Sequence, residues 1–129
     1  MAKDIIHNSV KNALIKDGWK IIADPFQLDY EEFTLFADLA ANKSFVAEKD
    51  RQQIVVEVKS FIGRSFVKDL QYALGQYEMY RDCLEMASSG YTLYLAINEH
   101  VYFNFFTQKA SQMIVNKHNM KIMIERMQK

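Results

Sequence analysis

The chain has 129 residues, of which half are apolar, so it is long enough for one buried core, and its 16 basic and 16 acidic residues leave no net charge to attract nucleic acid or an anionic membrane. We therefore expect one soluble α/β domain over residues 1–129, on which any basic surface is local. Cys83 is the only cysteine, which excludes an intrachain disulfide, favours a reducing cytoplasmic environment and fits inert packing in a helix. Charged residues interrupt positions 1–18, which therefore lack the apolar run of a signal peptide or membrane span.

Apolar spacing in the first half of the chain predicts one helix and three strands. These are an amphipathic helix over residues 3–17 and strands over residues 19–22, 34–40 and 54–61. Gly18 is a plausible helix stop, and the Asp24-Pro25 turn ends the first strand because proline fixes its own φ. The last of the strands is the clearest because β-branched residues fill it. Residues 44–53 could form a further strand and a polar turn, and the sequence leaves this open.

The second half predicts a long helix and then a strand, a helix and a strand. Ser65 can cap the long helix, which should extend to about Ala87 before the Ser-Ser-Gly sequence at 88–90. The remaining elements are a strand over residues 91–97, a helix within 100–117 and a strand over 121–125. The crossover through the long helix should be right-handed and join parallel strands. The expected fold class is thus α/β, with a mixed central sheet flanked by helices.

The polar residues that carry chemical information are Glu57 and Lys59, which lie among valines on the predicted strand 54–61. Alternation along a strand places both side chains on one face of the sheet, where burying charges is costly unless they pair or bind a metal. Asp38 lies inside the apolar strand 34–40, and an adjacent strand could bring it beside Glu57. Two neighbouring carboxylates favour a hard divalent cation such as Mg²⁺ or Mn²⁺. Lys59 could then position an attacking water or offset phosphate charge.

With these residues, the sequence resembles the PD-(D/E)XK nuclease superfamily, in which an acidic residue on one strand precedes an E-x-K strand and a helix. The resemblance implies a restriction-endonuclease-like fold and metal-dependent phosphodiester hydrolysis. It also implies that Asp38 and Glu57 hold Mg²⁺, with the Val58 carbonyl as a further ligand. Lys59 would assist the attacking water. The sequence departs from the superfamily pattern at Ala37, which stands where many members have proline, a position at which the superfamily is permissive.

The predicted long helix carries Gln76 and Tyr80, similar to the Q-x-x-x-Y motif of the RecB-like branch, in which both residues lie near the active site. Their ordinary alternatives are an exposed glutamine and a core tyrosine whose hydroxyl reaches water. His7 lies on the first helix, where related nucleases often carry an acidic residue, and it could bind metal or contact phosphate. A surface or capping histidine is the commoner case, and Asp4 has no better claim.

Other polar residues provide weaker signals. The E-x-K triplet by itself is common and also fits a solvated ion pair. His100 and His118 have no recognisable ligand spacing, and Glu48-Lys49 lies in a polar stretch that fits solvated charges.

A second resemblance covers nearly the whole chain and is to the XisH family. It rests on the segments AKDIIHNSVKNALIKDGW, LFADLAA, VAEKDRQQIVVEVKSF and LGQYEMYRDCL. This family is the excision controlling factor of the cyanobacterial fdxN element. It is associated with programmed removal of that DNA element in heterocyst differentiation, alongside a recombinase and the small protein XisI. The resemblance implies a role in DNA rearrangement, but a nuclease scaffold can also be kept for binding or regulation.

Two hypotheses therefore remain open at this stage. In the first, the chain is a Mg²⁺-dependent endonuclease-like enzyme acting through Asp38, Glu57 and Lys59. In the second, it is a non-catalytic control factor that docks on a recombinase or on an XisI-like protein, which the neutral charge favours slightly. A local phosphate-binding rim would support the first hypothesis. Its candidate members are Lys43, Arg64 and Lys68.

Surplus apolar residues predict an interface. The chain has 7 Met and 17 aromatic residues, counted as 9 Phe, 7 Tyr and 1 Trp. Residues 101–106, VYFNFF, and the tail HNMKIMIERMQK hold more apolar surface than one small core can bury. We expect either a homo-oligomer or a partner protein to cover part of it. The alternative is that these residues complete the core.

Overall fold

A five-stranded mixed sheet forms the centre of the protein in a computed structural model, which describes residues 4–44 and 51–126. Its strand order is β1-β4-β5-β6-β7, with antiparallel pairing up to β5 and parallel pairing from β5 onward. The sheet strands are β1 (Lys20–Ala23), β4 (Leu39–Lys43), β5 (Gln52–Val58), β6 (Thr92–Asn98) and β7 (Ile122–Glu125). The expected mixed sheet, with parallel strands joined through the long helix, is therefore confirmed.

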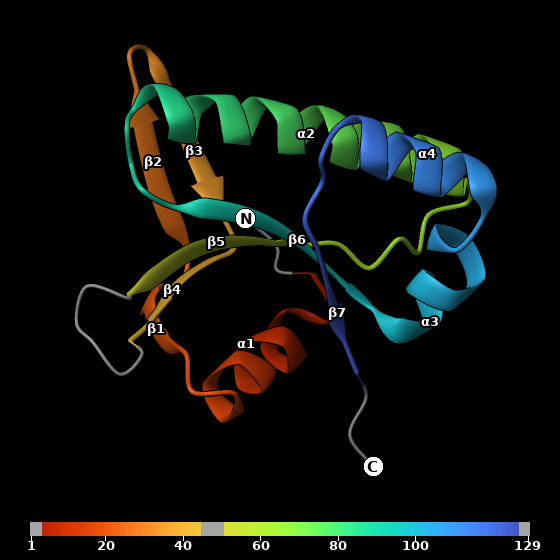
Figure 1. The fold of residues 1–129 in the computed structure, drawn as a ribbon, viewed down its shortest axis with the longest axis horizontal. Coiled ribbons are helices and arrows are strands. Elements are labelled where there is room, and N and C mark those ends of the chain that lie inside the picture. Colours follow the sequence, from red (N-terminus) through yellow and green to blue (C-terminus); the bar gives the residue numbers. More distant parts are fainter. Residues whose placement is uncertain (1–3, 45–50, 127–129) are drawn as a thin grey trace.

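Helices cover both faces of this sheet (Figure 1). One face packs against α1 (His7–Lys16), where Val10 and Leu14 meet Val56 and Val58 in one buried cluster. The opposite face packs against α2 (Phe66–Met86) and α4 (Lys109–Lys117), and Val55 belongs to that second cluster. Alternation along β5 thus divides the valines between two cores and directs Glu57, an odd-numbered position like that of Val55, toward α2.

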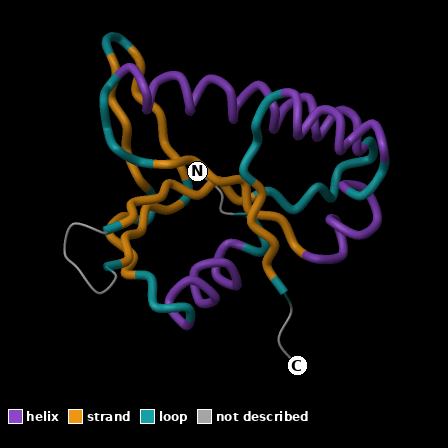
Figure 2. Tube along the Cα trace, viewed as in Figure 1, coloured by secondary structure: helices purple, strands orange, loops and turns teal. Residues whose placement is uncertain are grey.

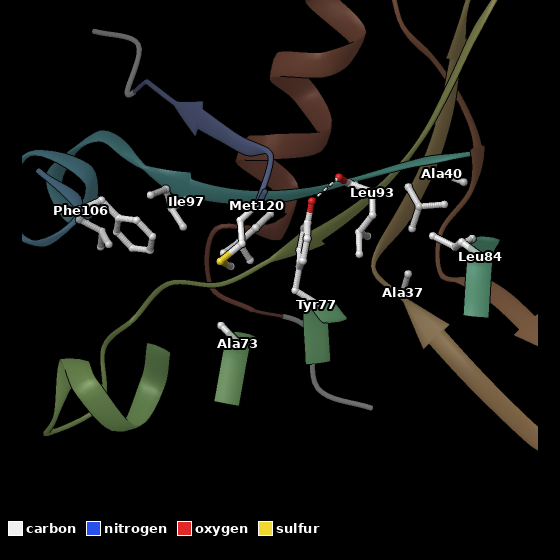
Figure 3. Close-up of a cluster of buried hydrophobic side chains, with 12 residues drawn as sticks. Ala37, Ala40, Ala73, Tyr77, Leu84, Leu93, Ile97, Phe106 and Met120 are labelled. Atoms are coloured by element: carbon white, nitrogen blue, oxygen red, sulfur yellow. Dashed lines mark hydrogen bonds between the residues drawn. The ribbon is translucent and has the colours of Figure 1, made fainter. Parts of the chain in front are cut away.

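The α2 helix has a defined start and a buried anchor to the sheet. Ser65 caps it by accepting a hydrogen bond from the Lys68 N–H at 3.2 Å, as predicted. Tyr77 is buried, and its hydroxyl donates to the Leu93 carbonyl at 3.0 Å and accepts from the Lys121 N–H at 2.9 Å (Figure 3). This hydroxyl therefore ties α2 to the sheet at β6 and to the residue that leads into β7.

A two-stranded hairpin extends away from the sheet, as the tube in Figure 2 makes clear. It consists of β2 (Phe26–Tyr30) and β3 (Phe33–Ala37). The predicted single strand over 34–40 is therefore wrong, because the chain leaves β3 and enters β4 at Asp38. On the two sides of that residue the backbone pairs with different partners, β2 before it and β1 with β5 after it.

The other predicted elements differ from the structure mainly at their ends. The first helix begins at His7 within the described residues, and the strand predicted over 54–61 spans Gln52–Val58, so Lys59 follows it. The helix expected within 100–117 is divided into three short parts. These are α3 (Glu99–Val101), a π-helical turn over Tyr102–Phe106, and α4. Of the undecided segment 44–53, residues 45–50 lie outside the described part. No described helix has the length and apolar composition needed to cross a membrane.

Candidate functional site

One pocket of about 820 Å³ gathers the predicted site residues where β3, β4 and β5 meet the start of α1 and the middle of α2. Its walls include Asp38 at the β3–β4 junction, Glu57 and Val58 at the end of β5, and Lys59 directly after it. Three further predicted residues, His7, Gln76 and Tyr80, also line it. Asp4, which on sequence has no better claim than His7, lines it as well, and the sequence did not indicate a site role for the remaining members, which are Asp24, Pro25, Phe36 and Tyr72.

Asp38 and Glu57 are linked by two reciprocal hydrogen bonds to backbone groups. The Asp38 N–H donates to Glu57 Oε1 at 2.9 Å, and the Val58 N–H donates to Asp38 Oδ2 at 2.7 Å. Each carboxylate therefore uses one oxygen to hold the strand junction in place. The other oxygen of each carboxylate has a more distant neighbour. Asp38 Oδ1 lies 3.8 Å from His7 Nδ1, and Glu57 Oε2 lies 3.9 Å from Lys59 Nζ.

Burial and mutual repulsion make this carboxylate pair hard to ionise fully. Burial and the neighbouring Asp38 charge raise the pKa of Glu57 to about 8, although Lys59 opposes the shift. Burial also raises the pKa of Asp38 above its ordinary value, against the hydrogen bond from Val58 and the charges of His7 and Lys59. Only 4% of Glu57 is exposed, so bulk water cannot relieve the repulsion. A divalent cation between the free oxygens would do so.

Lys59 lies at the mouth of the site although it is not part of β5. Its N–H still donates to the Ala96 carbonyl of β6 at 3.0 Å, so the backbone position remains fixed by the sheet. Its ammonium lies 3.9 Å from Glu57 Oε2 and 4.9 Å from the centre of the Tyr72 ring. The side chain therefore shares the pocket with Glu57, as strand alternation predicted, even though the strand is shorter than expected.

His7 joins the pocket from α1, and a carboxylate holds it there. Its Nε2 lies 2.9 Å from Asp24 Oδ1, and Lys11 Nζ donates to Asp24 Oδ2 at 2.7 Å. Although burial opposes it, the hydrogen bond from Lys11, together with His7, holds the pKa of Asp24 below its ordinary value. Because an ionised carboxylate only accepts hydrogen bonds, Nε2 is the protonated nitrogen. In the neutral ring, the lone pair on Nδ1 therefore faces Asp38.

The Nδ1 atom of His7 has an unmet need for a partner. The residue is 2% exposed, and Nδ1 is buried without a hydrogen bond in the described structure. Its distance of 3.8 Å from Asp38 Oδ1 exceeds a hydrogen bond, and with the ring neutral these two acceptors face each other and require a cation or a water between them. This orphaned nitrogen is the second indication, after the carboxylate pair, that the pocket holds a ligand.

Gln76 and Tyr80 form a third polar unit on α2. The Gln76 amide donates to the Tyr80 hydroxyl at 3.3 Å, and that hydroxyl donates to the Phe36 carbonyl at 3.0 Å. Burial raises the pKa of the Tyr80 hydroxyl above its ordinary value, so it stays a neutral donor. The Gln76 Oε1 atom is buried without a partner and lies in the pocket wall. The tyrosine thus anchors the β2–β3 hairpin to α2, while the glutamine retains one free acceptor.

Asp4 connects two ends of the site that are far apart in the sequence. Its Oδ2 accepts from the Ser60 N–H at 2.9 Å and its Oδ1 from the Ile6 N–H at 3.1 Å. The carboxylate therefore ties the start of α1 to the segment after Lys59. No local sequence pattern could have indicated this contact. The same holds for the contact between Asp24 and His7, which are separated in the chain by the rest of α1 and by β1.

Comparison with known proteins identifies the family. The family model described as "XisH protein" matches residues 1–129. The chain belongs to the XisH family. A crystal structure of an XisH family protein from Nostoc punctiforme PCC 73102 is similar over 94% of this chain and 90% of its own, with 33% identity and a TM-score of 0.83. The crystal structure of an fdxN element excision controlling factor protein from Anabaena variabilis is similar over 95% of this chain and 90% of its own, with 33% identity and a TM-score of 0.82. Among curated proteins, none matches.

The two carboxylates in the pocket of this XisH chain are the ligand type that magnesium takes in proteins. No group of three or more His, Cys, Asp or Glu side chains arranged to hold a metal occurs in residues 4–44 and 51–126. Magnesium typically binds through one or two carboxylates and keeps water or phosphate oxygens as its other ligands. The free oxygens of Asp38 and Glu57 provide that minimum, and the buried Nδ1 of His7 faces the same space.

Several candidate residues lie outside this pocket. Lys43 on β4 lies 3.6 Å from Asp17 Oδ2 and over the Trp19 ring, and it does not line the pocket. Arg64 and Lys68 are exposed and also absent from its wall, so the three residues do not form the expected rim around it. His118 lies 3.5 Å from Glu78, and the His100 ring contacts Asn104. Cys83 is buried in α2, and Glu48-Lys49 lies outside the described residues.

Proposed function

We propose that this XisH-family protein cleaves phosphodiester bonds in DNA with a divalent metal, as part of DNA element excision. The observation that carries the proposal is the reciprocal pairing of Asp38 and Glu57, which leaves one free oxygen on each carboxylate in a pocket that also holds Lys59. An acidic residue at a strand junction, followed by E-x-K at a strand end and then by a helix, fits the PD-(D/E)XK pattern. The α/β architecture is consistent with a restriction-endonuclease-like fold.

Magnesium or manganese, when bound, would neutralise the two carboxylates and polarise a phosphoryl oxygen. Asp38 and Glu57 would hold it, with the Val58 carbonyl as a further ligand. Lys59 would orient a water and offset the negative charge that develops on phosphate. The water oxygen would lose a proton to solvent and form a new bond to phosphorus as one P–O ester bond breaks, and the departing oxygen would take up a proton from solvent.

The remaining polar groups would position this chemistry. Asp24 keeps the His7 ring in the orientation that presents Nδ1 to Asp38, so His7 would add a ligand to the metal or hold a water bound to it. Gln76 would offer its unpartnered Oε1 to the pocket, and Tyr80 would fix the hairpin that carries Phe36.

A link to DNA excision is supported by the protein from Anabaena variabilis, which is described as an fdxN element excision controlling factor. We extend that role to this chain as removal of a comparable DNA element, with a recombinase as a partner. Such a role in programmed rearrangement fits a cyanobacterial setting such as heterocyst differentiation.

A non-catalytic control factor is the second candidate, and the surface of the protein favours it. The net charge is zero, whereas proteins that hold duplex DNA alone neutralise several phosphates with clustered basic residues. Large apolar side chains are also exposed in several regions. Examples are Ile5, Ile62, Val67, Met86, Phe103 and Met113. In this alternative, these residues bind an XisI-like protein, a recombinase or a second copy of the chain.

Metal titration with matched variants tests the nuclease proposal. Mg²⁺ and Mn²⁺ are titrated into wild type and into Asp38→Ala, Glu57→Ala and Lys59→Ala, with cleavage of supercoiled, linear and branched DNA scored in parallel. Glu85→Ala and Lys109→Ala are the controls, because both residues are exposed and outside the pocket. We expect metal-dependent cleavage that is lost in the three site variants and kept in both controls. Absence of cleavage and of metal binding in folded wild type refutes the nuclease and leaves the control factor.

A further inference from the structure

Two exposed aromatic rings line the pocket beside its carboxylates. Phe36 is 37% exposed on β3, and Tyr72 is 67% exposed on α2. The Tyr80 hydroxyl bonds the Phe36 carbonyl, so the backbone that carries the phenylalanine is fixed to α2. The exposed part of a large ring gains nothing from folding. A flat partner that fills the pocket would cover this exposed surface.

Helix geometry arranges two tyrosines and one glutamine of α2 in a row that faces the pocket. Tyr72, Gln76 and Tyr80 are spaced four residues apart, so they lie on one face with about 6 Å between successive positions along the axis. The Lys59 ammonium lies 4.9 Å from the centre of the Tyr72 ring, which places a positive charge at the ring face beside the carboxylates. A linear chain that alternates flat groups with negative charges would match this row.

Electrostatics around the pocket disfavour a DNA duplex. Lys59 is the only lysine or arginine among the described residues that line it, against the carboxylates of Asp4, Asp24, Asp38 and Glu57. The β2–β3 hairpin, whose Phe36 lines the pocket, adds acidic side chains at positions 29, 31 and 32 toward its turn. Duplex binding depends on neutralising several phosphates. A single strand can instead gain affinity by stacking its unpaired bases on aromatic rings, which does not require a broad basic surface.

We propose that the pocket binds an unpaired nucleic-acid strand, with bases stacked on Tyr72 and Phe36 and one phosphate contacting the Lys59 ammonium. This inference rests on the proposed function, since it names the form of substrate that the same site accepts. The protein would then act on DNA that is already opened or branched, and a partner would have to supply that opening. The acidic hairpin would keep the paired part of such a substrate away from the site.

Equilibrium binding of labelled oligonucleotides tests the preference. A fluorescein-labelled thymidine strand of about 20 nucleotides is compared with a duplex of the same length. Both are measured in Ca²⁺, a hard cation that also takes oxygen ligands, and again in EDTA. We expect the single strand to bind at least tenfold more tightly than the duplex. Tyr72→Ala and Phe36→Leu should each weaken it by about fivefold or more, as loss of one stacked base predicts. Phe103→Ala is the control, because Phe103 is 60% exposed on a different element.

A fluorescent base gives an independent readout of stacking. Strands that carry 2-aminopurine at successive positions should show quenching at one or two positions when wild type binds. The quenching should be lost in Tyr72→Ala and retained in Tyr72→Phe, which keeps the ring. Equal quenching in Tyr72→Ala and wild type overturns the assignment of that ring, whether or not the overall affinity changes.

The outcomes separate this inference from the nuclease proposal. A single-strand preference that depends on both rings supports the inference even when no metal-dependent cleavage occurs, in which case the nuclease proposal alone fails. Duplex binding as tight as single-strand binding overturns the inference, and cleavage lost in Asp38→Ala would still support the nuclease. A preference unaffected by Tyr72→Ala and Phe36→Leu also overturns it.

Discussion

The buried carboxyl group of Glu57 should make the metal-free protein less stable as the pH rises. Its pKa is raised from the ordinary value of 4.5 to about 8 in the folded chain, because burial and Asp38 penalise the charged form. Between these two values the folded protein keeps the proton that the unfolded chain has released. Folding therefore takes up a proton, and the free energy of unfolding decreases with pH over this interval.

The size of the effect follows from the interval. Stability changes by about 1.4 kcal/mol per pH unit for one proton, so raising the pH from about 6.0 to 7.5 should cost about 2 kcal/mol. Above pH about 8 both states are ionised and the loss from this group ends. In Glu57→Gln, the amide oxygen can still accept the Asp38 N–H but cannot ionise, so the loss between these pH values should disappear. Divalent metal should reverse it in wild type by favouring the charged pair.

Urea denaturation followed by far-UV circular dichroism, in EDTA at both pH values, measures this difference. Glu85→Gln is the matched control and should keep the wild-type loss, because Glu85 is exposed and lies outside the pocket. Repeating the series with Mg²⁺ should stabilise wild type at pH 7.5 and leave Glu57→Gln unchanged. A pH dependence in Glu57→Gln equal to that of wild type would show that other groups cause it and refute the reasoning.

Two further predictions concern the core that supports the site. Tyr77→Phe should lower the free energy of unfolding by about 1–3 kcal/mol in urea denaturation, because the Leu93 carbonyl and the Lys121 N–H both lose a buried partner; a change below 0.5 kcal/mol would contradict this. Phe106→Ala should cost about 3–5 kcal/mol, since the ring is fully buried, whereas Phe103→Ala should change stability by less than about 0.5 kcal/mol; equal losses would disprove the placement of the two rings.

Sequence alone predicts only part of the pocket, because only some of its residues are marked by a pattern among their neighbours in the chain. Glu57 and Lys59 stand out because β-branched neighbours define the strand and its alternation. Gln76 and Tyr80 stand out because their spacing on the predicted helix resembles the Q-x-x-x-Y motif. Asp24 and Tyr72 carry no such signal. The first acquires its role from contact with α1, and the second from exposure beside Lys59, and neither can be derived from neighbours in the chain.

The sequence alone determined the elements with strong periodicity and the family. The valine-rich β5, the long α2 with its serine cap, and the apolar β6 follow from local side-chain patterns that depend on strand and helix geometry. Tertiary structure decided where the chain changes sheets. Residues 34–40 have the pattern of one strand, yet the backbone breaks at Asp38 because the Asp38 N–H binds Glu57 and the flanking segments pair with different strands. Strand pairing is a nonlocal choice, and this one places two carboxylates together and creates the pocket.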